Sequence, residues 1–233
     1  MILYTNGDSH TAAAECVNNH AFAEDDPQYF MMGRVPHPEN LERSWGKLLS
    51  NRLSCGFKTD AESASSNTRI IRTTRNWLEQ QAKDIYRTLY VIQWSTWERE
   101  EWLIDGEYYQ INASGIDDVP KSHQQKYKEY VANIDWQIKT TKAHKQIWKF
   151  HLELEALGAK HIFFNGNNDF GSIEDKKDWG ASYILPYDTK GTFNSIVSNR
   201  CYTVSPTSYH YGADGHRVWA QYLTKYIVDN RLV

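Results

Sequence analysis

Residues 2–10 of the chain read Ile2-Leu3-Tyr4-Thr5-Asn6-Gly7-Asp8-Ser9-His10, and this stretch decides the fold. The apolar run at residues 2–5 is typical of a buried first strand, and Gly7 allows a tight turn directly after it. Open α/β sheets bind ligands at the carboxyl ends of their strands, so Ser9 is expected at a ligand site. Residues 12–15, Ala-Ala-Ala-Glu, then predict a helix. That helix would place Ser9 at its N-terminus, where free N–H groups stabilise an oxyanion.

The rest of the chain alternates between short β-favouring runs and segments with helical spacing of apolar residues. Strands are predicted at residues 56–59, 89–94 and 161–164. Helices are predicted after Ser44, after residues 63–67, between 122 and 157, and around 218–227, with a loop at 18–44. This alternation indicates a mostly parallel sheet. We therefore expect one α/β domain over residues 1–233, a three-layer α/β/α sandwich with a loop or lid insertion at about 97–121.

Composition excludes several classes of protein. The 233 residues carry a net charge of −3, and the basic residues are scattered, so neither nucleic acid nor an anionic membrane is an expected partner. Three cysteines make a disulfide framework improbable, and no His, Cys, Asp and Glu group has the spacing of a zinc site, so no metal or other cofactor is expected. No apolar run reaches the roughly 20 residues of a spanning helix, and no signal peptide precedes the first strand. A cytoplasmic or virion-associated protein is expected.

A second motif lies near the C-terminus. Residues 210–220, His-Tyr-Gly-Ala-Asp-Gly-His-Arg-Val-Trp-Ala, lead from a loop into an amphipathic helix. Together with Gly7-Asp8-Ser9, this segment resembles the SGNH/GDSL hydrolase family, whose first block is Gly-Asp-Ser and whose last block places a His before a helix. The resemblance implies the flavodoxin-like fold of that family and a serine ester hydrolase that works through an acyl-enzyme.

The resemblance implies roles for particular residues. Serine needs a base to take its proton, and Ser9 and His210 match the nucleophile and the base of the family. His216 starts the last helix and is expected to pack there. The family places an Asp three residues before the His, where this chain has Thr207. The acid partner is therefore open: a backbone carbonyl, Thr207 or an acid from elsewhere, with Asp214 as a nearby candidate.

The oxyanion donors implied by the resemblance are spread over three blocks. They are the Ser9 N–H, the N–H of Ala64 at the family's glycine position, and the Ser95 hydroxyl at its asparagine position. Gly166-Asn167-Asn168-Asp169 matches the family's Gly-x-Asn-Asp literally but follows a later strand, so Asn168 is a second candidate. Ser95 and Asn168 are equally typical of an ordinary turn. Asp8, beside the nucleophile, is a further candidate site residue.

The stretch from Trp94 to Trp102 is rich in tryptophan and charge, which favours a charged helix turn with aromatic side chains toward the core. Alternatively, Arg99 and an aromatic wall position an anionic or sugar substrate. We expect an esterase for small acyl groups, with acetylated carbohydrate as the favoured substrate. The alternative is a weakly active or inactive relative that binds carbohydrate or serves as a virion structural protein, since the middle blocks also resemble phage-encoded members of the family.

Overall fold

A single parallel sheet forms the centre of the protein. The computed structural model describes residues 1–17 and 36–233. Its strands are β1 (Ile2–Asn6), β2 (Gly56–Thr59), β3 (Thr88–Trp94) and β6 (Lys160–Asn165), in the order β2-β1-β3-β6. All three pairings are parallel, with Tyr4 opposite Lys58 and Tyr90, and Tyr90 opposite His161. The four predicted strands are therefore present.

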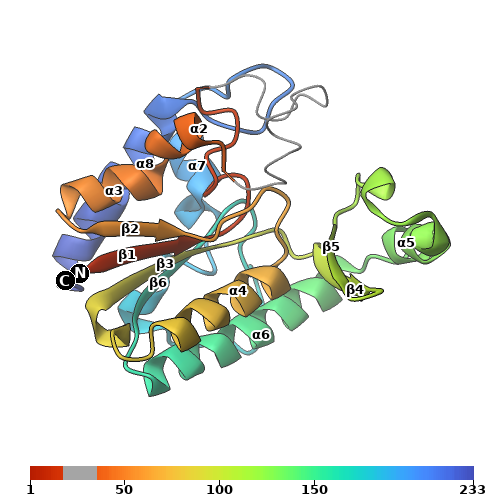
Figure 1. The fold of residues 1–233 in the computed structure, drawn as a ribbon, viewed down its shortest axis with the longest axis horizontal. Helices are drawn as coiled ribbons and strands as arrows, with labels where there is room; N and C mark the ends of the chain where they lie inside the picture. The colour runs from red at the N-terminus through yellow and green to blue at the C-terminus, as the bar shows by residue number, and fades with distance from the viewer. Residues whose placement is uncertain (18–35) are drawn as a thin grey trace.

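Helices cover both faces of the sheet (Figure 1). On one face lie α3 (Trp45–Arg52), α7 (Phe193–Ser198) and α8 (Ala213–Asp229); on the other lie α4 (Asn67–Gln80) and α6 (Trp136–Ala156). Ser44 and Ser66 cap α3 and α4 by accepting an N–H from the first turn. The expected three-layer α/β/α sandwich with a parallel sheet is confirmed.

Alternation along the strands explains the three layers, because successive side chains of a strand point to opposite faces. Leu3 and Val91 pack with Trp219 of α8, whereas Tyr4 and Ile92 pack with α4 and α6. Each face buries a continuous apolar cluster. Burial of both faces is what a parallel sheet requires, since its strands leave neither face to water.

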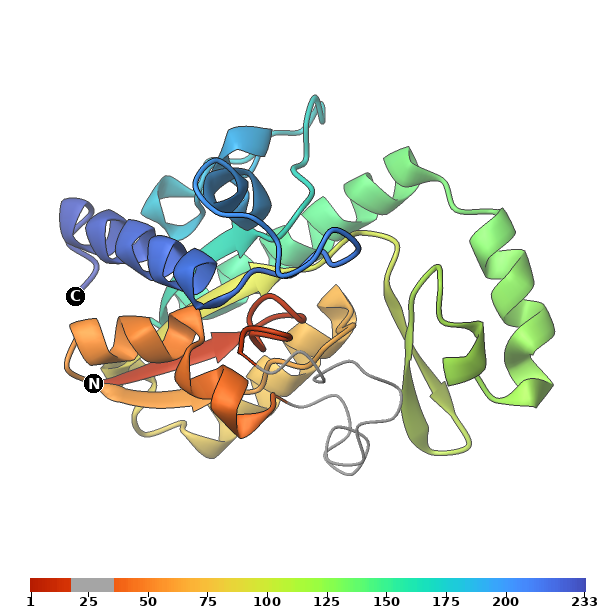
Figure 2. The same ribbon diagram turned by 90° about the horizontal axis from the view of Figure 1, so that it is seen from above.

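A small lobe extends from one side of the sheet (Figure 2). It consists of the antiparallel hairpin β4 (Glu100–Ile104) and β5 (Glu107–Ile111) and of helix α5 (Gln124–Ala132). Its own apolar cluster contains Trp102, Ile104, Ile111, Val119 and Tyr127. The helix turn expected between Trp94 and Trp102 is wrong, because Trp102 lies in β4, where alternation buries Trp102 and Ile104 and leaves Leu103 exposed.

Two other expectations need correction. The predicted loop at residues 18–44 lies partly outside the described residues, and within the described part Pro38–Glu42 forms the short helix α2. Pro38 suits the first helical turn, and His37 accepts the Glu39 N–H as its cap. The helical segment at 122–157 is two helices, because Asp135 caps a new start at α6 by accepting the Ile138 N–H.

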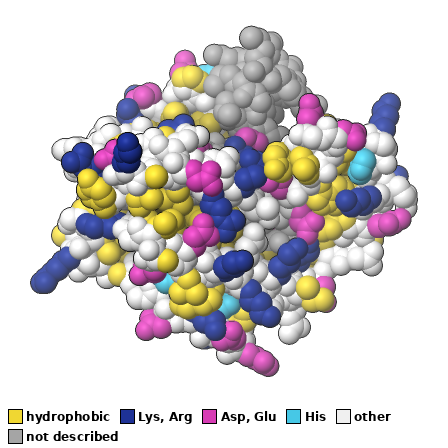
Figure 3. Space-filling model, turned by 60° about the horizontal axis from the view of Figure 1, so that its bottom comes forward, with side chains coloured by type: hydrophobic (Ala, Val, Ile, Leu, Met, Phe, Trp, Pro, Cys, Tyr) yellow, Lys and Arg dark blue, Asp and Glu magenta, His cyan; other side chains and the backbone are white. Residues whose placement is uncertain are grey.

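The face formed by the lower helices of Figure 1 has no single-sign patch in the described part of the chain. Lys and Arg side chains lie beside Asp and Glu side chains, with hydrophobic side chains between them (Figure 3). None of the helices within residues 1–17 and 36–233 is both long enough and apolar enough to cross a membrane.

Candidate active site

The candidate site lies at the point where the order of the strands in the sheet reverses. From β1 the chain continues to β2 on one side and then returns to β3 on the other side of β1. A crevice forms at such a switch point, beyond the carboxyl ends of the two strands. Ser9 follows β1, and Ser95 follows β3 directly. The topology thus brings together two segments that are far apart in the sequence.

The turn after β1 is not a helix. Residues 9–15 form successive turns, in which Ala12 N–H donates to Asp8 O (2.9 Å) and Ala14 N–H to Ser9 O (3.0 Å). Ala13 and Glu15 have φ of 55° and 58°, in the left-handed region, which ends any right-handed helix. The predicted helix at residues 12–15 is therefore wrong, and Ser9 has no regular helix N-terminus behind it.

Gly7 lets this turn lie against β3. A Cβ on Gly7 would lie 2.4 Å from Thr11 Oγ1 and 2.8 Å from Gln93 Cβ, so no larger residue fits. The Gln93 amide fastens the turn from both ends: its oxygen accepts from Thr11 Oγ1 (2.6 Å), and its nitrogen donates to Asp8 Oδ1 (2.6 Å). The turn that carries Ser9 is thus held rigidly on the strand.

Asp8 is a buried carboxylate with a complete set of donors. Ser95 Oγ and Arg99 Nη1 donate to its Oδ2 at 2.8 and 3.1 Å, in addition to Gln93 and the His10 N–H. Burial alone would raise the pKa of Asp8, but the charges of His10 and Arg99 and the hydrogen bonds lower it below its usual value. Asp8 therefore positions the turn and holds Ser95 and Arg99. Its negative charge is compensated by these donors within the protein.

Glu15 is a carboxylate that the structure places against His210. His210 Nδ1 lies 2.7 Å from Glu15 Oε2, and Ser208 Oγ donates to the same oxygen at 2.5 Å. Both His210 and Glu15 are mostly covered, with side chains 17% and 20% exposed. The hydrogen bond with His210 lowers the pKa of Glu15. The positive φ of Glu15 turns this side chain toward the C-terminal loop, a feature that the expected helix concealed.

The other candidate acids do not meet His210. Thr207 is exposed, and its hydroxyl contacts Ser205 Oγ at 3.3 Å. Asp214 is 76% exposed and pairs with Arg217 one turn along α8 at 2.7 Å. Among the described residues, Glu15 is thus the carboxylate in contact with His210.

Three histidines lie near Ser9, and they differ in their surroundings. The His10 ring lies 5.5 Å from the His210 ring and 5.1 Å from Phe193, and burial lowers the pKa of His10 to about 4. His216 is buried, and its Nδ1 accepts the Trp45 N–H at the start of α3 (3.2 Å). Burial lowers the pKa of His216 to about 3, so it stays neutral as an acceptor. His210 lies in the loop that reaches Glu15, whereas His216 joins two helices.

Ser9 itself is 7% exposed. Its hydroxyl makes no hydrogen bond with any described residue, His210 included, and the same is true of its N–H. Catalytic hydrogen bonds are often long in a ligand-free enzyme and shorten when the substrate binds. The structure therefore brings His10, the residue after Ser9, into ring contact with His210, but it shows no hydrogen bond between Ser9 and His210.

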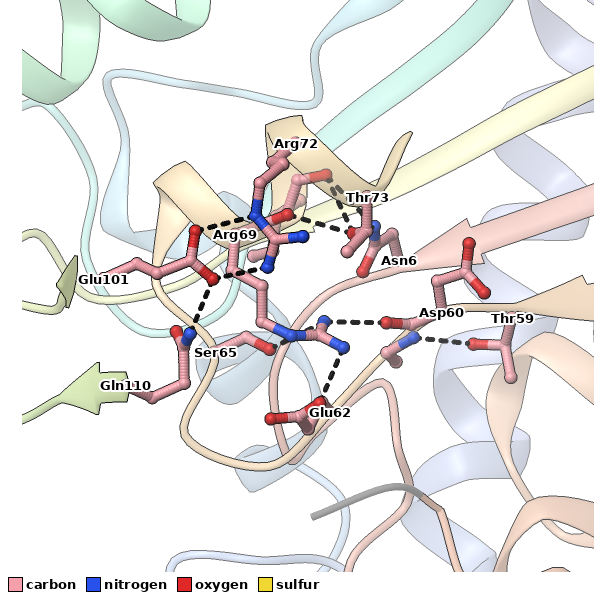
Figure 4. A network of polar contacts seen from close by, with 12 residues as sticks. Asn6, Thr59, Asp60, Glu62, Ser65, Arg69, Arg72, Thr73, Glu101 and Gln110 are labelled. Atoms are coloured by element: carbon pink, nitrogen blue, oxygen red, sulfur yellow. Dashed lines mark hydrogen bonds and ion pairs between the residues drawn. The ribbon is translucent and has the colours of Figure 1, made fainter. Parts of the chain in front are cut away.

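The Ala64 loop is fixed by an arginine network (Figure 4). Arg69 donates to Asp60 O and Ser65 Oγ and pairs with Glu62 at 2.6 Å, so it holds residues 60–66 on α4. Ala64 has φ of 64°, a conformation that favours glycine. Its N–H has no partner among the described residues. Ala64 thus has a backbone conformation that glycine adopts more easily.

The same network fastens the hairpin to α4. Arg72 donates to both oxygens of Glu101 in β4, at 2.9 and 2.6 Å, and Gln110 of β5 donates to Glu101 at 2.8 Å (Figure 4). Gln110 Oε1 in turn accepts the Ser66 N–H at 3.0 Å. The hairpin in the expected insertion at 97–121 is thus attached to the helix that follows the Ala64 loop.

Ser95 and Asn168 differ from the roles expected of them. The Ser95 hydroxyl is donated to Asp8, and its backbone is held by both ends of the Asn67 amide. Asn168 Oδ1 is buried without a partner in the described part of the chain, while its neighbour Asn167 has its amide nitrogen 3.4 Å from His10 Nε2. Asn167 is therefore the residue of that loop that touches the site.

Sequence reasoning missed Glu15, Gln93 and His10 as members of this site. Only the position of Glu15 and His10 beside Ser9 hints at their place, because long-range contacts with residues 93 and 210 involve no motif. Away from Ser9, the described residues contain one group of three possible metal ligands, His151, Glu155 and His161. The i, i+4 spacing of His151 and Glu155 was its only sequence signal.

The structure is thus an α/β/α protein in which Ser9 follows the carboxyl end of β1 and His210 contacts Glu15. The chain belongs to the family of unknown function DUF6071, whose sequence pattern matches residues 36–153. A search of curated proteins found no match.

Two solved structures, each 11% identical to this chain, have a TM-score of 0.45. One is described as a lipolytic protein of the G-D-S-L family from Desulfitobacterium hafniense DCB-2. The match spans 97% of this chain and 98% of that protein's chain. The other is the psychrotrophic esterase EstA from Pseudoalteromonas sp., inhibited by monoethylphosphonate. This match spans 98% of this chain and 97% of the esterase chain.

Proposed function

We propose that this protein is a serine ester hydrolase in which Ser9, His210 and Glu15 act together. The observation that carries the proposal is the 2.7 Å contact between His210 Nδ1 and Glu15 Oε2. The His210 ring also lies 5.5 Å from the ring of His10, the residue that follows Ser9. A carboxylate on Nδ1 holds the imidazole in the tautomer whose Nε2 accepts a proton, and it stabilises the imidazolium that forms. Glu15 thus supplies what Thr207 lacks.

The proposed reaction has two steps. Ser9 Oγ attacks the ester carbonyl as His210 takes its proton, and His210 then returns that proton to the leaving alcohol. Water, activated by His210, next attacks the acyl-enzyme and releases the acid. The N–H groups of Ser9 and Ala64, which have no partner in residues 1–17 and 36–233, are the proposed oxyanion donors.

Arg99 is proposed in place of Ser95 as the side chain that stabilises the oxyanion. The Ser95 hydroxyl is donated to Asp8, whereas Arg99 Nε is buried without a partner among the described residues. The guanidinium lies against Asp8 and influences the pKa of His10, the two neighbours of Ser9. A cation at this point stabilises negative charge that develops on the substrate. Small acyl esters, with acetylated carbohydrate as the favoured case, are the proposed substrates.

A fluorophosphonate probe and a panel of small esters test the proposal. We expect labelling of the native protein on Ser9, seen as a mass increase of one adduct, and hydrolysis of acetyl esters. Ser9→Ala should lose both while its circular dichroism stays native, because only one oxygen is removed. Unchanged turnover by pure Ser9→Ala would refute the mechanism.

A second function is favoured by two observations. The Ser95 hydroxyl is engaged by Asp8 and the Ser9 side chain is almost covered, which suits a carbohydrate-binding or virion structural protein without turnover. No labelling and no ester hydrolysis, together with binding of an unmodified oligosaccharide that Ser9→Ala retains, would support this alternative.

A further inference from the structure

A cluster of two histidines and a glutamate lies outside the candidate active site. His151 and Glu155 are one turn apart on α6, and His161 is on β6, at the level of Tyr4 in β1. One ligand atom from each of the three residues lies within 4.8 Å of the others. Ser9 lies beyond the carboxyl end of β1, whereas His161 is the second residue of its strand. The cluster is therefore separate from the esterase machinery.

The tautomer of His161 is set by the backbone. His161 Nδ1 lies 2.8 Å from Ala159 O, an acceptor, so Nδ1 carries the hydrogen and Nε2 presents its lone pair. His151 Nδ1 lies 2.8 Å from this Nε2. A carbonyl that accepts the other ring N–H is the usual support of a histidine that binds a metal. His151 Nδ1–H is then the donor to this lone pair, and a metal ion bound between the two nitrogens would replace that hydrogen.

We propose that His151, His161 and Glu155 bind one divalent transition-metal ion of the zinc type. Two imidazoles and a carboxylate form a three-ligand set that leaves the fourth position of a tetrahedral ion to water. Nitrogen ligands select zinc, cobalt, nickel or copper over magnesium and calcium, which prefer oxygen. At metal–nitrogen distances of about 2.0–2.1 Å, the two nitrogens of a tetrahedral site stand about 3.3 Å apart, so the rings must separate by about half an ångström.

A cavity lies against part of the cluster. A cavity of about 330 Å³ is lined by Glu155 and His161, together with Lys160, Ser182 and Arg231. The Glu155 side chain is 56% exposed, so it can turn toward an ion that enters there. The bound ion would join α6 to β6, the outermost strand of the sheet. Zinc should therefore stabilise the fold, while ester hydrolysis at Ser9 should not depend on it.

Titration of the metal-free full-length protein with ZnCl₂, followed by calorimetry and by thermal unfolding, tests this site. We expect one equivalent to bind, the unfolding temperature to rise, and a chelator to reverse the rise without changing ester turnover. Co²⁺ in place of Zn²⁺ should give the visible absorption bands of a tetrahedral ion with nitrogen and oxygen ligands. No tight equivalent of Zn²⁺ would overturn the proposal.

Variants then assign the site. Glu155→Gln changes an exposed residue and should keep the fold, yet weaken Zn²⁺ binding at least tenfold. Glu153→Gln, on the same helix, pairs with Arg75 outside the cluster and should bind Zn²⁺ as the native protein does. His151→Gln should abolish the Co²⁺ bands if it folds. Native affinity in Glu155→Gln, or equal losses in Glu155→Gln and Glu153→Gln, would show that the ion binds elsewhere and refute the assignment.

Discussion

The Glu15 carboxylate meets His210 because the backbone leaves the right-handed region at Ala13 and Glu15. A left-handed residue costs roughly 1–2 kcal/mol when it is not glycine, so the turn must be held by its surroundings. Burial of residues 12–14 and the hydrogen bonds of Gln93 provide that support. Strain at two residues is thus coupled to the position of the proposed acid.

The first prediction concerns this acid. Glu15→Gln should lower kcat by about 10²–10⁴-fold with little change in KM, because an amide on Nδ1 no longer stabilises the imidazolium. Steady-state hydrolysis of a small acetyl ester measures it. Asp214→Asn is the matched control and should keep native turnover, since Asp214 is exposed and pairs only with Arg217 among the described residues. The opposite pattern would make Asp214 the acid.

The second prediction separates two histidines. His210→Asn should lose about as much activity as Ser9→Ala, because members of a Ser-His unit act together and their losses do not add. His216→Asn should instead lower the free energy of unfolding by about 1–3 kcal/mol, because the buried acceptor of the Trp45 N–H is disturbed. Measuring the free energy of unfolding in urea and the ester turnover of both variants tests this prediction. A well-folded but inactive His216→Asn with an active His210→Asn would contradict the assignment.

At the scale of elements, the loop between β2 and α4 depends on Arg69, and the hairpin depends on Arg72. Both arginines lie on α4 and each pairs with a mostly covered glutamate, Glu62 or Glu101. Paired charges that are also hydrogen-bonded are tolerated at partly buried sites, whereas a single unpaired one is costly. Helix α4 therefore holds the proposed oxyanion loop and the hairpin in one arrangement.

The third prediction concerns the oxyanion loop. Ala64→Gly should retain esterase activity, because the N–H donor remains. It should also stabilise the fold by up to about 1 kcal/mol, because glycine adopts φ of 64° without strain. The greater entropy of glycine in the unfolded chain reduces this gain. Ala156→Gly, in the last turn of α6, is the control and should destabilise by up to about 1 kcal/mol. Equal destabilisation by both changes would argue against strain at Ala64.

At the scale of the whole molecule, the structure buries histidines in their neutral form. The pKa of His10 is lowered to about 4 and that of His216 to about 3, chiefly by burial. An unfolded histidine has a pKa near 6.5, so the unfolded chain binds more protons than the native one below that pH. The stability that these neutral histidines contribute is therefore fully present above pH 6.5, and it is lost as the pH falls toward about 3.

The fourth prediction concerns this fall of stability with falling pH. The free energy of unfolding in urea should fall steadily from pH 7 to pH 4, and His10→Phe should reduce the slope if it folds. His123→Gln, in the small lobe next to α5, should leave the slope unchanged. Asp8 and Glu15, whose pKa values are lowered, add a loss at still lower pH. A stability that is flat between pH 7 and pH 4 would contradict burial of neutral His10 and His216.

The sequence by itself determined the layers of this protein and the ends of its proposed site. Alternation in residues 2–5, 89–94 and 161–164 places both faces of a parallel sheet in the core, and such patterns are local. It also marked Ser9 and His210 through short motifs, whose roles await the tests above.

Only the tertiary structure decided the connections between them. Glu15 meets His210 across 195 positions of sequence, and Asp8 takes up the Ser95 hydroxyl across 87. The alanine run at 12–14 favours a helix locally, but contacts with β3 and with the C-terminal loop override that preference. His161 meets His151 only because β6 packs under α6. Propensity acts over a few residues, whereas packing brings distant residues together, so the partners of each side chain were beyond the reach of any local pattern.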